Sequence, residues 1–74
     1  MVNKFYYKVD VSGKNGYSFM ISTTQELMED EVISVSQDYD LFIDEEDVNY
    51  AVVDDLVTDY DIKAFGDNII DVEV

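Results

Sequence analysis

Carboxylates are the side chains of this chain whose spacing could do chemistry. They occur as Asp38-x-Asp40 and as the run Asp-Glu-Glu-Asp at residues 44–47, and hard cations such as Ca²⁺ bind clusters of carboxylate oxygens. An EF-hand loop that began at Asp38 would place Phe42 at a ligand position and Ile43 where the turn requires glycine. The spacing therefore predicts no dedicated calcium site, and we expect neither a metal nor another cofactor.

The side chains that most enzymes use are missing. The chain has no His and no Cys, and all four of its basic residues are Lys, so the usual general base, thiol nucleophile and bidentate phosphate clamp are absent. A pair of carboxylates could hydrolyse a glycoside, but that reaction needs a cleft around a sugar, which 74 residues can hardly enclose. Gly13, Gly16 and Gly66 match no phosphate-binding loop. We expect a binding protein and not an enzyme.

The charge balance is the most informative property of the composition. Eighteen acidic residues stand against four Lys, for a net charge of −14. Residues 1–25 carry three Lys and one Asp, or +2, whereas residues 26–74 carry one Lys and 17 acids, or −16. Such a surface repels nucleic acid and destabilises the fold through self-repulsion, which favours a cationic partner.

The acidic residues between positions 38 and 61 are therefore the candidate partner-binding residues, either as phosphate surrogates or as salt-bridge partners. A compact chain of this length has a diameter of roughly 29 Å, and B-DNA carries roughly 17 phosphates over that distance. The net charge of −16 on residues 26–74 is of the same order. The alternative interpretation is that each carboxylate is an ordinary solvated charge. The candidates are Asp38, Asp40, Asp44, Glu45, Glu46, Asp47, Asp54, Asp55, Asp59 and Asp61.

The elements that position these residues begin with a hairpin. Residues 4–11 and 17–23 both alternate apolar and polar side chains, as half-buried strands do, and residues 12–16 collect turn formers. The expected inward set is Phe5, Tyr7, Val9 and Val11 facing Tyr17, Phe19 and Ile21. Tyr6, Met20 and Tyr50 could be exposed interface anchors or could pack within the sheet.

A helix is expected to follow the hairpin. Thr23-x-x-Glu26 fits a capping box, so the helix should begin between residues 24 and 29. Its apolar stripe would contain Val32, Val35 and Tyr39, although the β-branched residues in this stretch also allow a short strand.

Two patterns compete over residues 44–57. The acidic run at 44–47 is either a loop or the first turn of a helix that continues through residue 57, whereas the valines of residues 50–57 favour a strand. Thr58-x-x-Asp61 is typical of a new helix start, with Gly66 as its C-terminal cap, so we favour a strand followed by a short helix. Residues 68–74 alternate as a last strand.

These elements predict a single acidic α+β domain over residues 1–74. The order is ββαβαβ, with an N-terminal β-hairpin and with the helices on one face of the sheet; a helix in place of the third strand is the main alternative. The absence of Cys, of a leader-like segment and of an apolar run of roughly 18 residues predicts a cytoplasmic protein without a membrane span.

In size, acidity and its plan of a hairpin with short helices, the chain resembles the small DNA-mimic inhibitors of bacteriophages and mobile elements, including anti-CRISPR and antirestriction proteins. The resemblance covers the character of the whole chain and no residue motif. It implies a protein of the bacterial host cytoplasm that binds the basic surface of a nuclease or its guide complex, and not nucleic acid itself, and so blocks DNA access. The alternative is a regulatory or assembly module that binds an unrelated basic protein or self-associates through its C-terminal strand edge.

Overall fold

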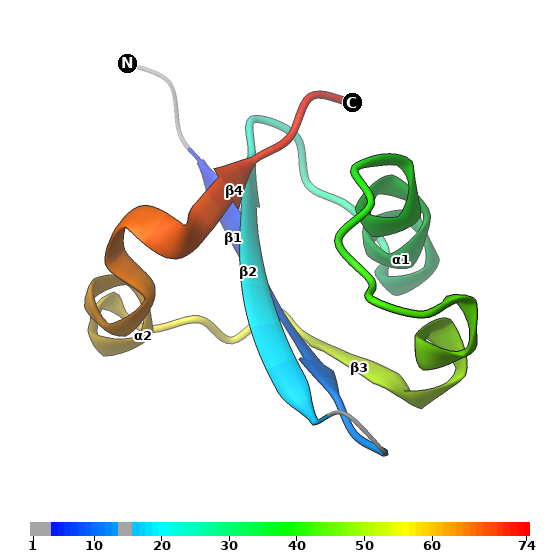
Figure 1. Cartoon of the computed structure of the whole chain (residues 1–74). Coiled ribbons are helices and arrows are strands. Elements are labelled where there is room, and N and C mark those ends of the chain that lie inside the picture. Colours follow the sequence, from blue (N-terminus) through cyan, green and yellow to red (C-terminus); the bar gives the residue numbers. More distant parts are fainter. Residues whose placement is uncertain (1–3, 14–15) are drawn as a thin grey trace.

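A computed structural model describes residues 4–13 and 16–74 and has the predicted α+β element order (Figure 1). Part of the predicted turn, residues 14–15, lies outside the described residues. Two short 3₁₀ helices, η1 and η2, interrupt the ββαβαβ order. The elements are β1 (Phe5–Val11), β2 (Tyr17–Thr23), α1 (Glu29–Asp38), η1 (Glu45–Tyr50), β3 (Ala51–Asp54), α2 (Asp59–Phe65), η2 (Gly66–Asn68) and β4 (Ile69–Asp71).

The four strands form one mixed sheet in the order β3-β1-β2-β4. β1 is antiparallel to both β2 and β3, and β4 is parallel to β2. The prediction that the helices share one face is wrong, because α1 lies on one side of the sheet and α2 on the other (Figure 1). β3 and β4 are opposite edge strands, so the segment between them must cross a face of the sheet, and it crosses the face that α1 leaves free.

The predicted inward set of the hairpin is confirmed. Tyr7 lies opposite Ile21 and Val9 opposite Phe19 in the β1–β2 register, and the ring of Phe19 packs edge-on against Phe42 with centroids 5.5 Å apart. Helix α1 closes this core with two valines of its predicted stripe. The buried core residues are Tyr7, Val9, Val11, Phe19, Ile21, Leu27, Val32, Val35 and Val72.

The other face of the sheet is also covered along β2. Met20 is fully buried and lies beside Ile69 of β4 in the parallel register. An exposed anchor at Met20 is therefore excluded. Helix α2 lies on this face of the sheet, opposite α1 (Figure 1). Tyr6 is half-buried and Tyr50 is exposed.

Helix α1 begins at Glu29, within the predicted range of 24–29, but the predicted cap at Thr23 is wrong. Thr23 is the last residue of β2, and its Oγ1 accepts a hydrogen bond from the backbone N–H of Gln25 at 3.3 Å. The helix begins at Glu29, where the Glu31 carboxylate accepts from the backbone N–H of Met28 at 3.1 Å. The threonine is held in the strand because its side chain is buried there, so the Thr23-x-x-Glu26 pattern caps no helix.

The competition over residues 44–57 has a mixed outcome. The acidic run belongs to the short helix η1, which ends at Tyr50, and β3 then pairs with β1, so a helix that continues through residue 57 is excluded. The later boundary is confirmed. The Asp61 carboxylate accepts from the Thr58 backbone N–H at 3.1 Å, Thr58 Oγ1 accepts from the Asp61 N–H at 3.2 Å, and Gly66 ends α2 at φ +53°.

Three tyrosine hydroxyls connect loops and the C-terminal tail to the sheet and to the C-terminal end of α1. Each accepts a hydrogen bond from a backbone N–H that has no carbonyl partner in a strand or helix. The pairs are Tyr7 with Leu27 at 2.7 Å, Tyr17 with Ile43 at 3.0 Å and Tyr39 with Glu73 at 2.9 Å. In the described part of the chain, no helix has the length and apolar character needed to cross a bilayer.

Candidate functional site

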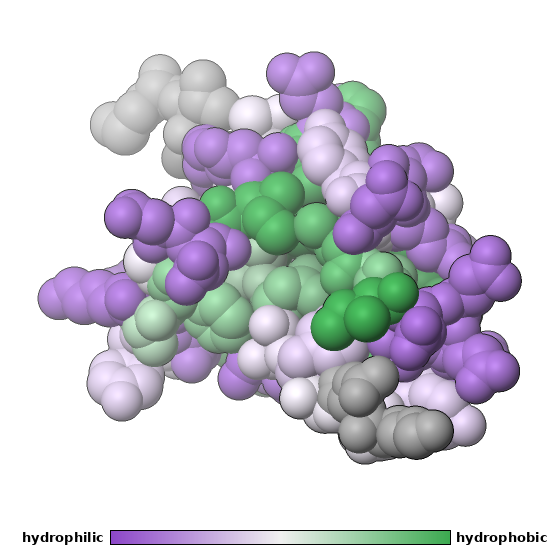
Figure 2. All heavy atoms as spheres, viewed as in Figure 1, coloured by the Kyte–Doolittle hydropathy of each residue, from purple (hydrophilic) through white to green (hydrophobic). Residues whose placement is uncertain are grey.

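The negative charge lies on the outside of the protein. Of the 18 acidic side chains, Asp47 and Asp61 are partly buried and the others are exposed. The described residues form a single ion pair, in which Lys4 Nζ lies 2.9 Å from Asp71 Oδ1. Figure 2 shows hydrophilic side chains around a central apolar area on one face. With four Lys in the chain, most of this charge has no internal counterion.

The structure separates the ten predicted residues into two groups. The first, the α1–η1 cluster, runs from the last residue of α1 into η1. The second, the β3–α2 cluster, runs from the last residue of β3 into α2. Strand β3 lies between them and spans roughly 13 Å at 3.3 Å per residue. The α1–η1 cluster contains Asp38, Asp40, Asp44, Glu45, Glu46 and Asp47, and the β3–α2 cluster contains Asp54, Asp55, Asp59 and Asp61.

Some of these carboxylates also hold local structure. Asp47 accepts hydrogen bonds from the Tyr17 hydroxyl at 2.8 Å and from the Asp44 N–H at 3.1 Å. Asp54 accepts from the Leu56 N–H at 2.9 Å and so ends β3. Asp61 forms the capping box of α2 with the N-cap residue Thr58, and the N–H and hydroxyl of Thr58 lower the pKa of Asp61 below its ordinary value of 3.8. Removing these groups would disturb the fold as well as the charge.

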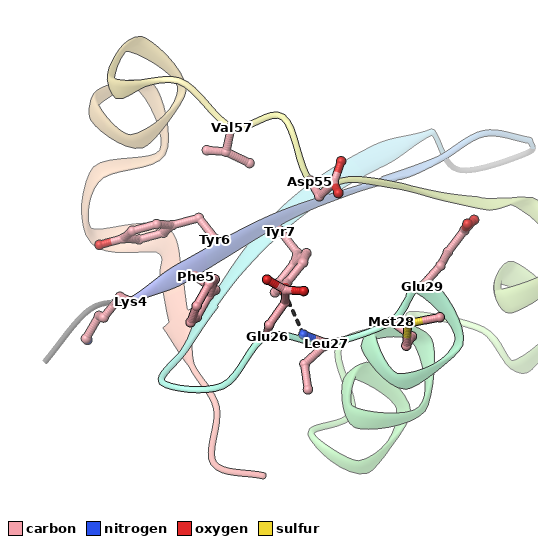
Figure 3. A pocket seen from close by; sticks show the side chains of 10 residues that line it. All are labelled: Lys4, Phe5, Tyr6, Tyr7, Glu26, Leu27, Met28, Glu29, Asp55 and Val57. Carbon is pink, nitrogen blue, oxygen red and sulfur yellow. Dashed lines mark hydrogen bonds between the residues drawn. The ribbon is translucent and has the colours of Figure 1, made fainter.

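A groove that the sequence did not single out lies beside the first half of β1 (Figure 3). Its volume is about 520 Å³. Figure 3 shows the segment from Glu26 to Glu29 along one side, with Asp55 and Val57 along the other. Asp55 is the one candidate carboxylate of the ten among its lining side chains, and Tyr6, a candidate interface anchor, also lines it. Three segments distant in sequence form this groove, so no local pattern could reveal it.

The described residues contain no group of three or more His, Cys, Asp or Glu side chains that could hold a metal ion. Comparison of the chain with protein-family models, curated proteins and solved structures gave no match.

Proposed function

We propose that this protein is a non-catalytic inhibitor that mimics DNA and occupies the cationic nucleic-acid groove of a CRISPR or restriction nuclease. The observation that carries the proposal is the exposure of 16 of the 18 carboxylates on a chain with only four Lys. A groove lined by Lys and Arg offers these carboxylates the counterions that the chain itself lacks.

The dimensions of the molecule support the comparison with a duplex. Its principal extents are 39 × 24 × 19 Å, with a radius of gyration of 11.7 Å. Over 39 Å of helix axis, B-DNA carries about 23 phosphates at one per 1.7 Å. The chain carries 18 carboxylates over the same length, so its density of negative groups approaches that of the duplex it would replace.

The positions of the two acidic clusters specify the kind of surface that would accept them. The α1–η1 cluster and the β3–α2 cluster lie at different ends of β3, on elements from opposite sides of the sheet. A flat basic patch would contact one cluster, whereas a groove with cations on both walls would contact both. Binding would release condensed counterions from both surfaces and weaken as salt increases.

Affinity capture from a bacterial lysate, followed by competition with duplex DNA, tests the proposal. We expect the captured protein to be a nucleic-acid enzyme, its cleavage activity to be inhibited, and excess duplex DNA to displace the inhibitor. A captured enzyme that duplex DNA fails to displace would refute the mimicry.

Matched variants locate the interface. The pairs Glu45→Gln with Glu46→Gln, and Asp55→Asn with Asp59→Asn, each neutralise two exposed carboxylates of one cluster. We expect both pairs to weaken inhibition, whereas Asp10→Asn, which neutralises an exposed carboxylate of the hairpin, should leave it nearly unchanged. An equal loss per neutralised carboxylate in all three variants would show that only net charge matters.

A regulatory or assembly module that binds a basic protein is the second candidate function, and the groove beside β1 favours it. Self-association through β4 has less support, because β4 has only three residues and each copy carries −14. Binding of a cationic protein without nucleic-acid activity would select this second function.

A further inference from the structure

The β1 edge that lines the groove carries unpaired backbone groups. Strand β3 pairs with β1 only from Lys8 to Val11. The Ser12 N–H donates to the Tyr50 carbonyl at 3.2 Å, and hydrogen-bonded pairs alternate along an antiparallel ladder. The N–H and C=O of Tyr6 therefore point toward the same edge, beyond the last pair that β3 makes.

The chain itself does not fill this edge. If β3 continued, Leu56 would lie opposite Tyr6, but its N–H donates instead to the Asp54 carboxylate at 2.9 Å. Among the described residues, none forms a backbone hydrogen bond with Tyr6 on this edge. The open stretch from Lys4 to Tyr7 is about 13 Å long at 3.3 Å per residue, enough for a short extended segment.

The lining of the groove indicates what such a segment would carry. Apolar side chains come from both walls, with Leu27 and Met28 on one and Val57 on the other. Met28 is 69% exposed and Leu56, beside the groove, is 83% exposed, which is unusual for large apolar side chains without a partner.

The charge of the groove lining is mostly negative. Glu26, Glu29 and Asp55 are exposed carboxylates at the groove. Lys4 is the one cation there among the described residues, and it is engaged by Asp71 at 2.9 Å. Each wall therefore carries both acidic and apolar side chains. Since alternate residues of a strand face opposite sides, a complementary segment has basic and apolar residues on each of its two faces.

We propose that the β1 edge from Lys4 to Tyr7 is a docking site for an extended segment of a partner protein that carries basic and apolar residues on both of its faces. The segment continues the sheet in line with β3 and pairs with the backbone of Tyr6. A second copy of this chain is a poor occupant because two surfaces of −14 repel each other. The inference does not depend on whether the partner is a nuclease.

The probe is the blocked peptide acetyl-(Lys-Lys-Val-Val)₂-amide, in which each face of the extended chain carries both Lys and Val, with binding measured by calorimetry at low salt. Two further peptides carry N-methyl groups on every odd-numbered or on every even-numbered residue, which removes the N–H donors from one edge of the strand and keeps all charges. We expect one of the two to bind roughly ten-fold or more weakly than the parent, because backbone hydrogen bonds are lost. Equal binding of all three peptides would overturn the proposal.

Amide exchange and matched protein variants provide independent tests. The parent peptide should slow hydrogen exchange of the Tyr6 amide, which a purely ionic contact would leave unchanged. Glu26→Gln, Glu29→Gln and Asp55→Asn should each weaken binding about two- to five-fold, as expected for exposed ion pairs, whereas Glu45→Gln, outside the groove lining, should have less effect. An unprotected Tyr6 amide, or equal effects of all four variants, would refute the site.

Peptide binding tests the docking site, and competition by DNA tests the DNA-mimic function, so the two proposals are tested separately. Competition by duplex DNA reports on the nuclease complex and involves no peptide, so either result can fail while the other stands. A dimer in sedimentation that the peptide dissociates would assign the edge to a second copy and overturn the choice of occupant.

Discussion

Replacement of Tyr7 by Phe tests the link between β1 and the loop that forms one wall of the groove. The Tyr7 hydroxyl accepts the Leu27 N–H at 2.7 Å, and both residues belong to the buried core. The substitution removes one oxygen and preserves the packing of the ring. It leaves a buried N–H without its acceptor, which costs about 1–3 kcal/mol.

That loss is large on the scale of this domain. A chain of 74 residues has a free energy of unfolding of about 4–11 kcal/mol, at about 0.05–0.15 kcal/mol per residue. A loss of about 2 kcal/mol would lower Tm by about 8–16 °C, at about 4–8 °C per kcal/mol for a domain of this size. Urea unfolding followed by far-ultraviolet circular dichroism measures the free energy, since the chain has no Trp.

Tyr39→Phe is the matched control. The Tyr39 hydroxyl accepts the Glu73 N–H at 2.9 Å, but Tyr39 is 40% exposed, so water can replace the lost acceptor. We expect this variant to lose about 0.5 kcal/mol or less. Equal losses in the two variants, or an unchanged stability of Tyr7→Phe, would refute the assignment of a buried hydrogen bond to Tyr7.

Three further predictions concern the helix cap, the net charge and the response to acid. Thr58→Ala should destabilise the protein by about 1 kcal/mol because it removes the N-cap of α2, whereas Thr24→Ala, at an exposed position before α1, should change urea stability by less than about 0.5 kcal/mol. Added NaCl should raise Tm by screening the repulsion within a chain of net charge −14, and a Tm that falls with salt would contradict this. Hydrogen bonds from Ser22 and Lys4 lower the pKa of Asp71 below 3.8, so its stabilisation is fully present above that value and is lost as pH falls through the folded-state pKa. The stability difference between the wild type and Asp71→Asn should therefore shrink in acid, and urea midpoints at about pH 6 and about pH 2 measure it.

Local patterns predicted several elements because local interactions decide them. The alternation in residues 4–11 and 17–23 predicted both strands of the hairpin and the side that each presents to the core. The Thr58-x-x-Asp61 spacing predicted the start of α2, because the capping atoms lie within one turn of backbone. The same spacing at Thr23 failed because burial in β2 competes with capping, and burial depends on neighbours distant in sequence.

The candidate site, too, has some properties that composition predicts and others that depend on the tertiary structure. Composition alone shows that the chain is acidic after residue 25, and it predicts that most carboxylates are exposed because ionised groups are costly to bury. Composition does not determine their arrangement. The path of β3 separates the ten candidate residues into two clusters, and the early end of β3 leaves the groove open beside β1.

The sequence by itself therefore determined the charge, the absence of the common catalytic side chains and the hairpin with its inward face. Only the tertiary structure decided that α2 crosses the sheet opposite α1, that Met20 is buried and that the backbone of Tyr6 is unpaired. The physical reason is that charge and side-chain alternation are properties of consecutive residues, whereas the pairing of strand edges and the cover of a sheet face depend on segments that meet only in the folded chain.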